Sequence, residues 1–165
     1  MDPVLITLLS VHLLLALGWL GGELMTAFVI GPGLKQLSLQ SKREFLAKVT
    51  PRAVRYVKWM IVGTGVTGFL LAFVTPSQLE ASGVVVAAGI VLALIAAAVE
   101  VVVTSPSFKK MSSLADALLK SGQQTPSPEM ATQEKRARWG SLADTGLLVA
   151  VLVLMVITGL NTTAA

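Results

Sequence analysis

The sequence predicts an all-α integral membrane protein, a bundle of four transmembrane helices built from two similar helical hairpins. Three observations lead to this fold class. The 165 residues are 54% hydrophobic and only 13% charged, well below the roughly 25% charged residues of an ordinary soluble domain. Four long apolar runs are present, and all the Lys and Arg residues fall in two separate segments. The absence of cysteine excludes a disulfide framework and a thiolate metal site.

The four apolar runs have the length, or nearly the length, that a bilayer requires. A helix that crosses about 30 Å of hydrocarbon needs about 20 residues, and within lipid only a helix satisfies its own backbone. The first run lacks the basic start and the cleavage site of a signal peptide, so we expect it to be retained. We predict one domain over 1–165, with membrane helices at about 4–31, 56–74, 84–104 and 140–161 and loops at 32–55 and 105–139.

The basic residues predict the orientation of these helices. Cytoplasmic loops collect Lys and Arg, so both basic segments are expected in the cytoplasm and both termini outside, in the cell inner (plasma) membrane. The net charge of +4 is then a topology signal, and we expect lipid rather than nucleic acid as the partner, within a homo-oligomer or a larger membrane complex. The two sets are Lys35, Lys42, Arg43, Lys48, Arg52, Arg55 and Lys58, and Lys109, Lys110, Lys120, Lys135, Arg136 and Arg138.

Both loops contain signals of local structure. Ser41-Lys42-Arg43-Glu44 has the form of a capping box and predicts a short amphipathic helix that starts there. Thr50-Pro51 predicts an N-cap and a first helical residue for the helix that leads into the second membrane span. In the second loop we expect a helix from about Ser107 to Lys120, followed by a flexible linker over 121–129.

The first half of the chain resembles the second half, which indicates an internal repeat. Gly31-Pro32-Gly33 ends the first apolar run, and Ser105-Pro106-Ser107 ends the third. The second begins with Lys58-Trp59, and the fourth with Arg138-Trp139. Two similar hairpins in the same orientation are typical of a parallel repeat, with any site at their junction.

The first predicted helix carries two ionisable residues, each of which costs about 2.5–3.5 kcal/mol in a membrane on insertion scales. Eleven residues at about 100° each bring Glu23 back to within about 20° of His12, with Trp19 between them. This stripe must face the bundle interior if His12 and Glu23 are to avoid lipid. Gly22 and its neighbouring glycines would let another helix or a flat cofactor approach closely.

Comparing depths across the helices gives two candidate sites. The outer site pairs His12 with Met155, because imidazole and thioether suit Cu(I) and can also ligate haem iron. The simpler alternative is that His12 hydrogen-bonds a neighbouring helix and Met155 fills the core.

The inner site groups Glu23, Glu100 and Asp144, which would pass cations or protons. The simpler alternatives are that Asp144 complements a helix dipole and that Glu100 snorkels from a helix end. No phosphate loop or nucleophile constellation is present in the sequence, so an enzyme is not the favoured class.

The opening helix resembles a known family. His12, six further residues and then Trp19-Leu20-Gly21-Gly22, with Pro32 ahead of a basic loop, are similar to the start of the CopD-like copper-resistance membrane domain. The resemblance covers about the first 75 residues. It implies a multi-helix membrane fold and a role in copper movement across the inner membrane. In this hypothesis His12 is the first metal ligand and Met155 the second.

The same spacing also resembles the HemJ-type haem b membrane proteins of the wider superfamily. By position, His12 would be the axial haem ligand, with Trp19 and Gly22 beside the macrocycle. Such proteins use a lysine within the third helix, whereas Glu100 is the charged residue of 84–103 here. The expected cofactor is therefore a copper ion or haem b. A third hypothesis is a non-catalytic structural subunit, in which His12 and Glu23 only join helices.

Overall fold

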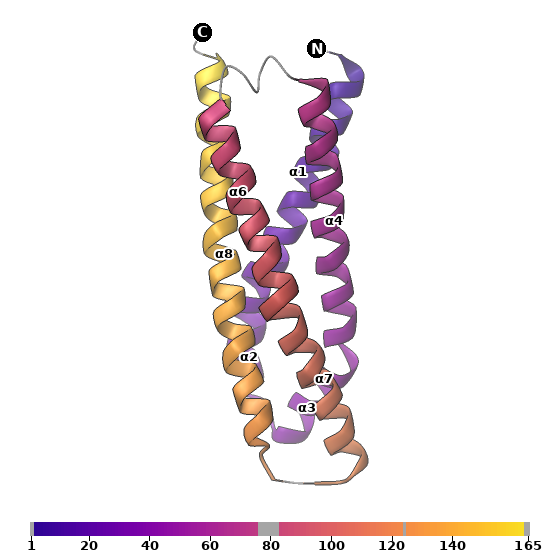
Figure 1. The fold of residues 1–165 in the computed structure, drawn as a ribbon. Coiled ribbons are helices and arrows are strands. Elements are labelled where there is room, and N and C mark those ends of the chain that lie inside the picture. The colour runs from indigo at the N-terminus through magenta and orange to yellow at the C-terminus, as the bar shows by residue number, and fades with distance from the viewer. Residues whose placement is uncertain (1, 76–82, 124, 164–165) are drawn as a thin grey trace.

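Four long helical segments run side by side in the computed structural model, which describes residues 2–75, 83–123 and 125–163, with side chains to Ile157 (Figure 1). Each segment is long and apolar enough to cross a membrane, which confirms the predicted all-α membrane bundle. The first comprises α1 (Pro3–Leu24), η1 (Met25–Ile30) and α2 (Gly31–Leu34), the second is α4 (Thr50–Val74), the third comprises α6 (Gly83–Val99), η2 (Glu100–Thr104) and α7 (Ser105–Lys120), and the fourth is α8 (Pro128–Thr163).

The outside of the bundle is apolar. Leu14, Phe73 and Val84 are 70%, 71% and 86% exposed, and many other large apolar side chains face outward with them. Soluble proteins rarely expose apolar surface on this scale, so lipid is the solvent that this surface requires. The small apolar core inside it comprises Trp19, Leu20, Val57, Ala96 and Leu148.

One end of the bundle carries the basic segments and the short helix α3 (Leu39–Lys48), and we refer to it as the basic end. The start of α1 and the end of α8 lie at the opposite end (Figure 1). Trp59 and Trp139 follow Lys58 and Arg138 and are 65% and 64% exposed. Tryptophan is enriched at the level of lipid headgroups, so these two residues mark the membrane interface at the basic end.

The first and third segments share a local irregularity, a π-helical stretch just before a proline. In η1 the N–H of Gly31 bonds to the carbonyl of Thr26, and in η2 the N–H of Ser105 bonds to that of Glu100. The physical reason is that the proline that follows has no N–H to donate and its ring clashes with the carbonyl four residues earlier. The matching positions of η1 and η2 agree with the two similar hairpins predicted from the sequence.

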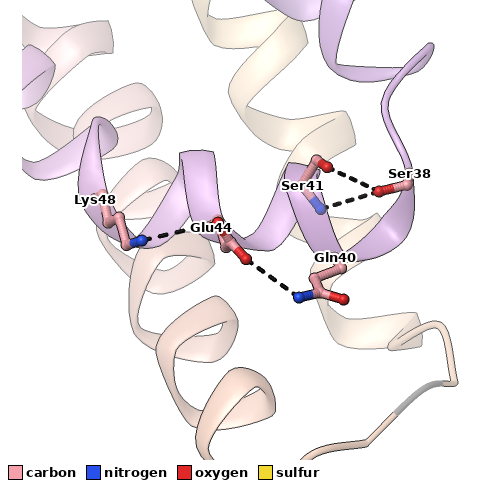
Figure 2. Close-up of polar contacts among 5 residues, drawn as sticks. All are labelled: Ser38, Gln40, Ser41, Glu44 and Lys48. Carbon is pink, nitrogen blue, oxygen red and sulfur yellow. Dashed lines mark hydrogen bonds and ion pairs between the residues drawn. The ribbon is translucent and has the colours of Figure 1, made fainter.

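The start of α3 corrects one sequence prediction. The N-cap is Ser38 and not Ser41, because the Ser38 hydroxyl accepts a hydrogen bond from the Ser41 N–H at 3.2 Å (Figure 2). Glu44 does not reach back to a cap. It accepts from Gln40 at 3.3 Å and pairs with Lys48 at 3.8 Å. The capping-box spacing was therefore the wrong signal, since an earlier serine was free to cap the helix.

Two other helices at the basic end, α4 and α8, begin before the predicted membrane spans. In α4 the capping position is Val49 rather than Thr50, although Pro51 does lie in the first turn as predicted. The predicted helix near Ser107 to Lys120 is confirmed as α7. The connection to α8 is held by buried Arg43, whose guanidinium donates to the carbonyls of Gln123 and Thr125. A second apolar cluster lies beneath these elements and comprises Leu34, Leu46, Ala115 and Met130.

Candidate functional site

Three acidic side chains meet inside the bundle, each from a different membrane-spanning segment. Glu23 lies near the end of α1, Glu100 begins η2, and Asp144 lies in α8. One carboxylate oxygen from each lies within 4.8 Å of the other two. Glu23, Glu100 and Asp144 are 2%, 3% and 0% exposed. We call this group the acidic triad, and it could hold a metal ion.

Two serine hydroxyls donate hydrogen bonds to carboxylates of the triad. The Ser141 hydroxyl donates to Oε2 of Glu23 at 2.6 Å, and the Ser105 hydroxyl donates to Oε1 of Glu100 at 2.5 Å. Ser141 lies one turn before Asp144 on the same helix, so α8 supplies both a donor and an acid to the centre. Ser105 is placed by the irregular turn of η2, five residues after Glu100.

The middle of the triad has acceptors without donors. Both carboxylate oxygens of Asp144, and Oε2 of Glu100, are buried and receive no hydrogen bond of regular geometry, although the Glu100 and Asp144 carboxyl groups lie close enough to share a proton. The hydroxyl of Thr104 is also buried and without a hydrogen bond of regular geometry. Buried polar groups in proteins are normally paired, so these oxygens would be satisfied by a bound cation or by shared protons.

Close approach of two helices brings the triad together. A Cβ on Gly140 of α8 would lie 2.4 Å from the hydroxyl oxygen of Thr104. A residue larger than glycine at that position would force the side chain of Thr104 to move. The glycine therefore allows α8 to approach the segment that carries Glu100.

The basic residues do not neutralise the triad. Within the described parts of the chain, the four ion pairs are Lys42–Glu134, Lys48–Glu44, Lys110–Glu129 and Lys120–Asp116, all at the basic end. Three ionised carboxylates this close would repel one another strongly in a medium of low dielectric constant. The triad must therefore be compensated by a cation or by protons.

His12 occupies a separate place, deeper toward the opposite end of the bundle. Its Nδ1 lies 3.0 Å from the hydroxyl oxygen of Thr67 in α4, and its side chain is buried with 9% of the residue exposed. A Cβ on Gly68 would lie 3.1 Å from its Cε1. His12 thus joins α1 to α4.

The other residues predicted for cofactor binding are core residues of the same helix. Trp19 is 3% exposed, and Gly22 faces the side chains of Val57 and Tyr56 in α4. Met155, predicted as the partner of His12, is 38% exposed on α8. A role for Met155 as a metal ligand therefore remains a prediction.

The sequence indicated the three acids of the triad but not their donors. Ser105 was noted only as a small residue beside Pro106, and Ser141 and Thr104 carried no signal of their own. The spacing of Ser141 and Asp144, three residues apart on one helix, was the available clue, since such residues share a face.

The fold and the site define a class of protein, a multi-pass helical membrane protein with a buried acidic triad. No protein-family model, curated protein or solved structure matches the chain.

Proposed function

We propose that this protein binds a metal cation at the acidic triad and passes it across the membrane, with copper as the cargo that the CopD-like pattern of α1 implies. The observation that carries the proposal is Asp144, a fully buried carboxylate that lies against two other acids and whose two oxygens receive no hydrogen bond from a hydroxyl or N–H group. Acids in membrane helices are usually functional because they are expensive to bury. A cation at the triad would satisfy these oxygens and offset the repulsion among the three acids.

The atoms of the triad that could act as metal-ligand donors are all oxygens, from carboxylates and hydroxyls. Such donors suit Mg²⁺, Ca²⁺ and Mn²⁺, whereas Cu(I) prefers thioether, thiolate or imidazole. Among divalent first-row metals, a given site binds Cu²⁺ most tightly. If copper is the cargo, we therefore expect the triad to bind it as Cu²⁺, with Mn²⁺ as a weaker occupant. A Cu(I) site would need His12 and a soft second ligand.

Haem b finds less support than copper. Of the α1 glycines that would leave room for a macrocycle, Gly18 and Gly22 are covered by side chains of α4, whereas Gly21 has nothing within 4 Å. A Cβ on Gly18 would lie 2.8 Å from Sδ of Met60, and one on Gly63 would lie 2.9 Å from Cδ1 of Leu15. These glycines therefore serve close helix packing, as small residues do in membrane proteins.

A structural subunit is the second candidate, and two hydrogen bonds favour it. The contact of His12 with Thr67 joins α1 to α4, and the bond from Ser141 to Glu23 joins α8 to α1. In this alternative the triad is neutralised by protons and holds no metal.

Metal binding to detergent-purified protein separates the two candidates. We expect the wild-type chain to bind one equivalent of Cu²⁺, measured by titration calorimetry and by the copper EPR signal. Asp144→Asn and Glu23→Gln should each weaken binding at least about tenfold, since each removes one anionic ligand. The matched control Glu129→Gln, at a half-exposed acid outside the triad, should bind as the wild type does.

Three further results would decide between the two candidates. Copper uptake into proteoliposomes that falls in Asp144→Asn but not in Glu129→Gln would support passage as well as binding. If no equivalent of Cu²⁺ or Mn²⁺ binds, or if Asp144→Asn binds it unchanged, the triad is not a metal site and the structural alternative stands. Loss of copper in His12→Ala alone would move the site to His12.

A further inference from the structure

A pocket lies at the basic end, close to the level of Trp139. It has a volume of about 80 Å³ and is lined by residues of η1, α2, α3, α7 and α8 and by Lys35, which follows α2. One part of its lining is apolar and includes Ile30, Leu34, Phe108 and Met111. The remainder includes Lys35, Lys42 and Arg138, with Glu134 as the acid among them.

The charges of this pocket do not cancel. Glu134 pairs with Lys42 at 2.6 Å, so its charge is already taken. Lys35 and Arg138 line the same pocket and have no acidic partner in the part of the chain that the structure describes. The pocket therefore has an excess of positive charge and favours an anion.

The position of the pocket identifies the source of that anion. Arg138 precedes the exposed Trp139, which marks the headgroup level, and Leu34 ends the first membrane span. A volume of about 80 Å³ corresponds to a few water molecules, enough for a phosphate group but not for acyl chains. The exposed side chains of Phe28 and Val29, 60% and 57% exposed, follow the lining residue Ala27 in sequence and offer an apolar surface for those chains.

We propose that this pocket binds the headgroup phosphate of an anionic phospholipid, with Lys35 and Arg138 as its cationic contacts. Basic pockets between membrane helices at the cytoplasmic side are suited to such headgroups. Arg138 offers a planar fork of donors to phosphate oxygens, and Lys35 adds a point charge. The pocket ends at Ser141, which also binds Glu23, so a bound lipid would brace α8 beside the triad.

Native mass spectrometry of the detergent-purified protein tests this proposal. We expect phosphatidylglycerol to remain bound in wild-type spectra, whereas phosphatidylcholine does not. The double variant Lys35→Gln, Arg138→Gln should weaken phosphatidylglycerol binding at least about tenfold. The matched control Arg55→Gln, Lys58→Gln removes two charges from exposed positions of α4 near Trp59 and should bind as the wild type does.

Three outcomes would overturn the proposal. The first is retention of phosphatidylcholine equal to that of phosphatidylglycerol, and the second is unchanged lipid binding in the double variant. The third is retention of inorganic phosphate as strong as that of the lipid, which would make the site one for a soluble anion. Should the Gln double variant fail to fold, the charge-conserving pair Lys35→Arg, Arg138→Lys replaces it. That pair should retain phosphatidylglycerol, and its loss despite a native helical spectrum would count against the proposal. None of these readouts depends on metal binding.

Discussion

Asp144 shows how strongly one buried side chain can constrain a membrane protein. Its carboxylate is fully buried, lies beside two other acids, and accepts no hydrogen bond from a hydroxyl or N–H group. A hydrophobic or amide side chain would be less costly there in the absence of a ligand. The residue is therefore better explained by what it binds than by any contribution to the stability of the bundle.

This explanation predicts opposite effects of one substitution on stability and on binding. Without added metal, Asp144→Asn should raise the midpoint of thermal unfolding in detergent, by about 2–4 °C for each kcal/mol of repulsion removed. With Cu²⁺ present, the wild type should gain stability and the variant should not. Differential scanning fluorimetry measures both quantities. A variant that is less stable than the wild type in the absence of metal would mean that Asp144 has a structural partner.

His12 is the second residue whose role can be tested on its own. His12→Ala removes a buried ring from the contact with Thr67 and Gly68, so it should lower stability by roughly 1–3 kcal/mol. Thr67 keeps a partner, since its hydroxyl also donates to the carbonyl of Gly63 at 2.7 Å. The control Ser10→Ala, at an exposed hydroxyl of the same helix, should change stability little. A stable His12→Ala variant that loses copper would show that His12 is a metal ligand rather than a contact that connects two helices.

At the scale of the elements, two features shape the site, the π-helical turns and the glycine contacts. In η2 the widened turn puts Ser105 within hydrogen-bonding distance of Glu100. π-helical turns of this kind are frequent at functional sites. In α8 the glycine at position 140 admits the side chain of Thr104. Both features are local consequences of small residues and proline, yet the glycine contact also brings side chains from two different spans together.

Two glycines of α8 provide a matched test of this packing. In Gly140→Ala the new methyl group would collide with Thr104, so we expect a loss of about 1–3 kcal/mol and weaker metal binding. Gly146→Ala meets nothing within 4 Å and should be neutral or more stable by up to about 1 kcal/mol, since alanine favours helix. Thermal unfolding of the two variants side by side measures the difference. Equal stability would show that η2 and α8 are not closely packed at this level.

At the scale of the whole molecule, the arrangement of charge determines the predicted orientation. All Lys and Arg residues lie between positions 35 and 58 or between 109 and 138, and both segments are at one end of the bundle (Figure 1). The positive-inside rule would then put that end in the cytoplasm.

The lack of native cysteine makes this orientation simple to measure. Asp2→Cys should react with a membrane-impermeant thiol reagent added outside intact cells, and Ser121→Cys should react only in inside-out vesicles. The wild-type chain, with no thiol, is the blank. Reaction of Ser121→Cys in intact cells would show that the topology is the reverse of the one predicted. The lipid pocket would then face the outer leaflet and not the cytoplasmic one.

Several parts of this picture followed from the sequence because they depend on local composition. The four spans follow from apolar runs of sufficient length, since a helix must have enough consecutive apolar residues to cross the hydrocarbon core. The three acids were conspicuous because charge is rare in lipid. The boundaries were less predictable. The cap of α3 is Ser38, because its hydroxyl was free to accept from the Ser41 N–H. Helix α8 begins at Pro128 because it continues into the basic end, where packing rather than lipid stabilises it.

The sequence by itself determined that the chain spans a membrane and which charged residues lie within it. Only the tertiary structure decided that Glu23, Glu100 and Asp144 converge within 4.8 Å, and that Met155 lies partly exposed on α8 while His12 contacts α4. The physical reason is that the rotation of each helix about its axis, and the depth at which helices meet, depend on contacts such as that of Gly140 with Thr104. Such contacts join residues far apart in the chain and have no local signal.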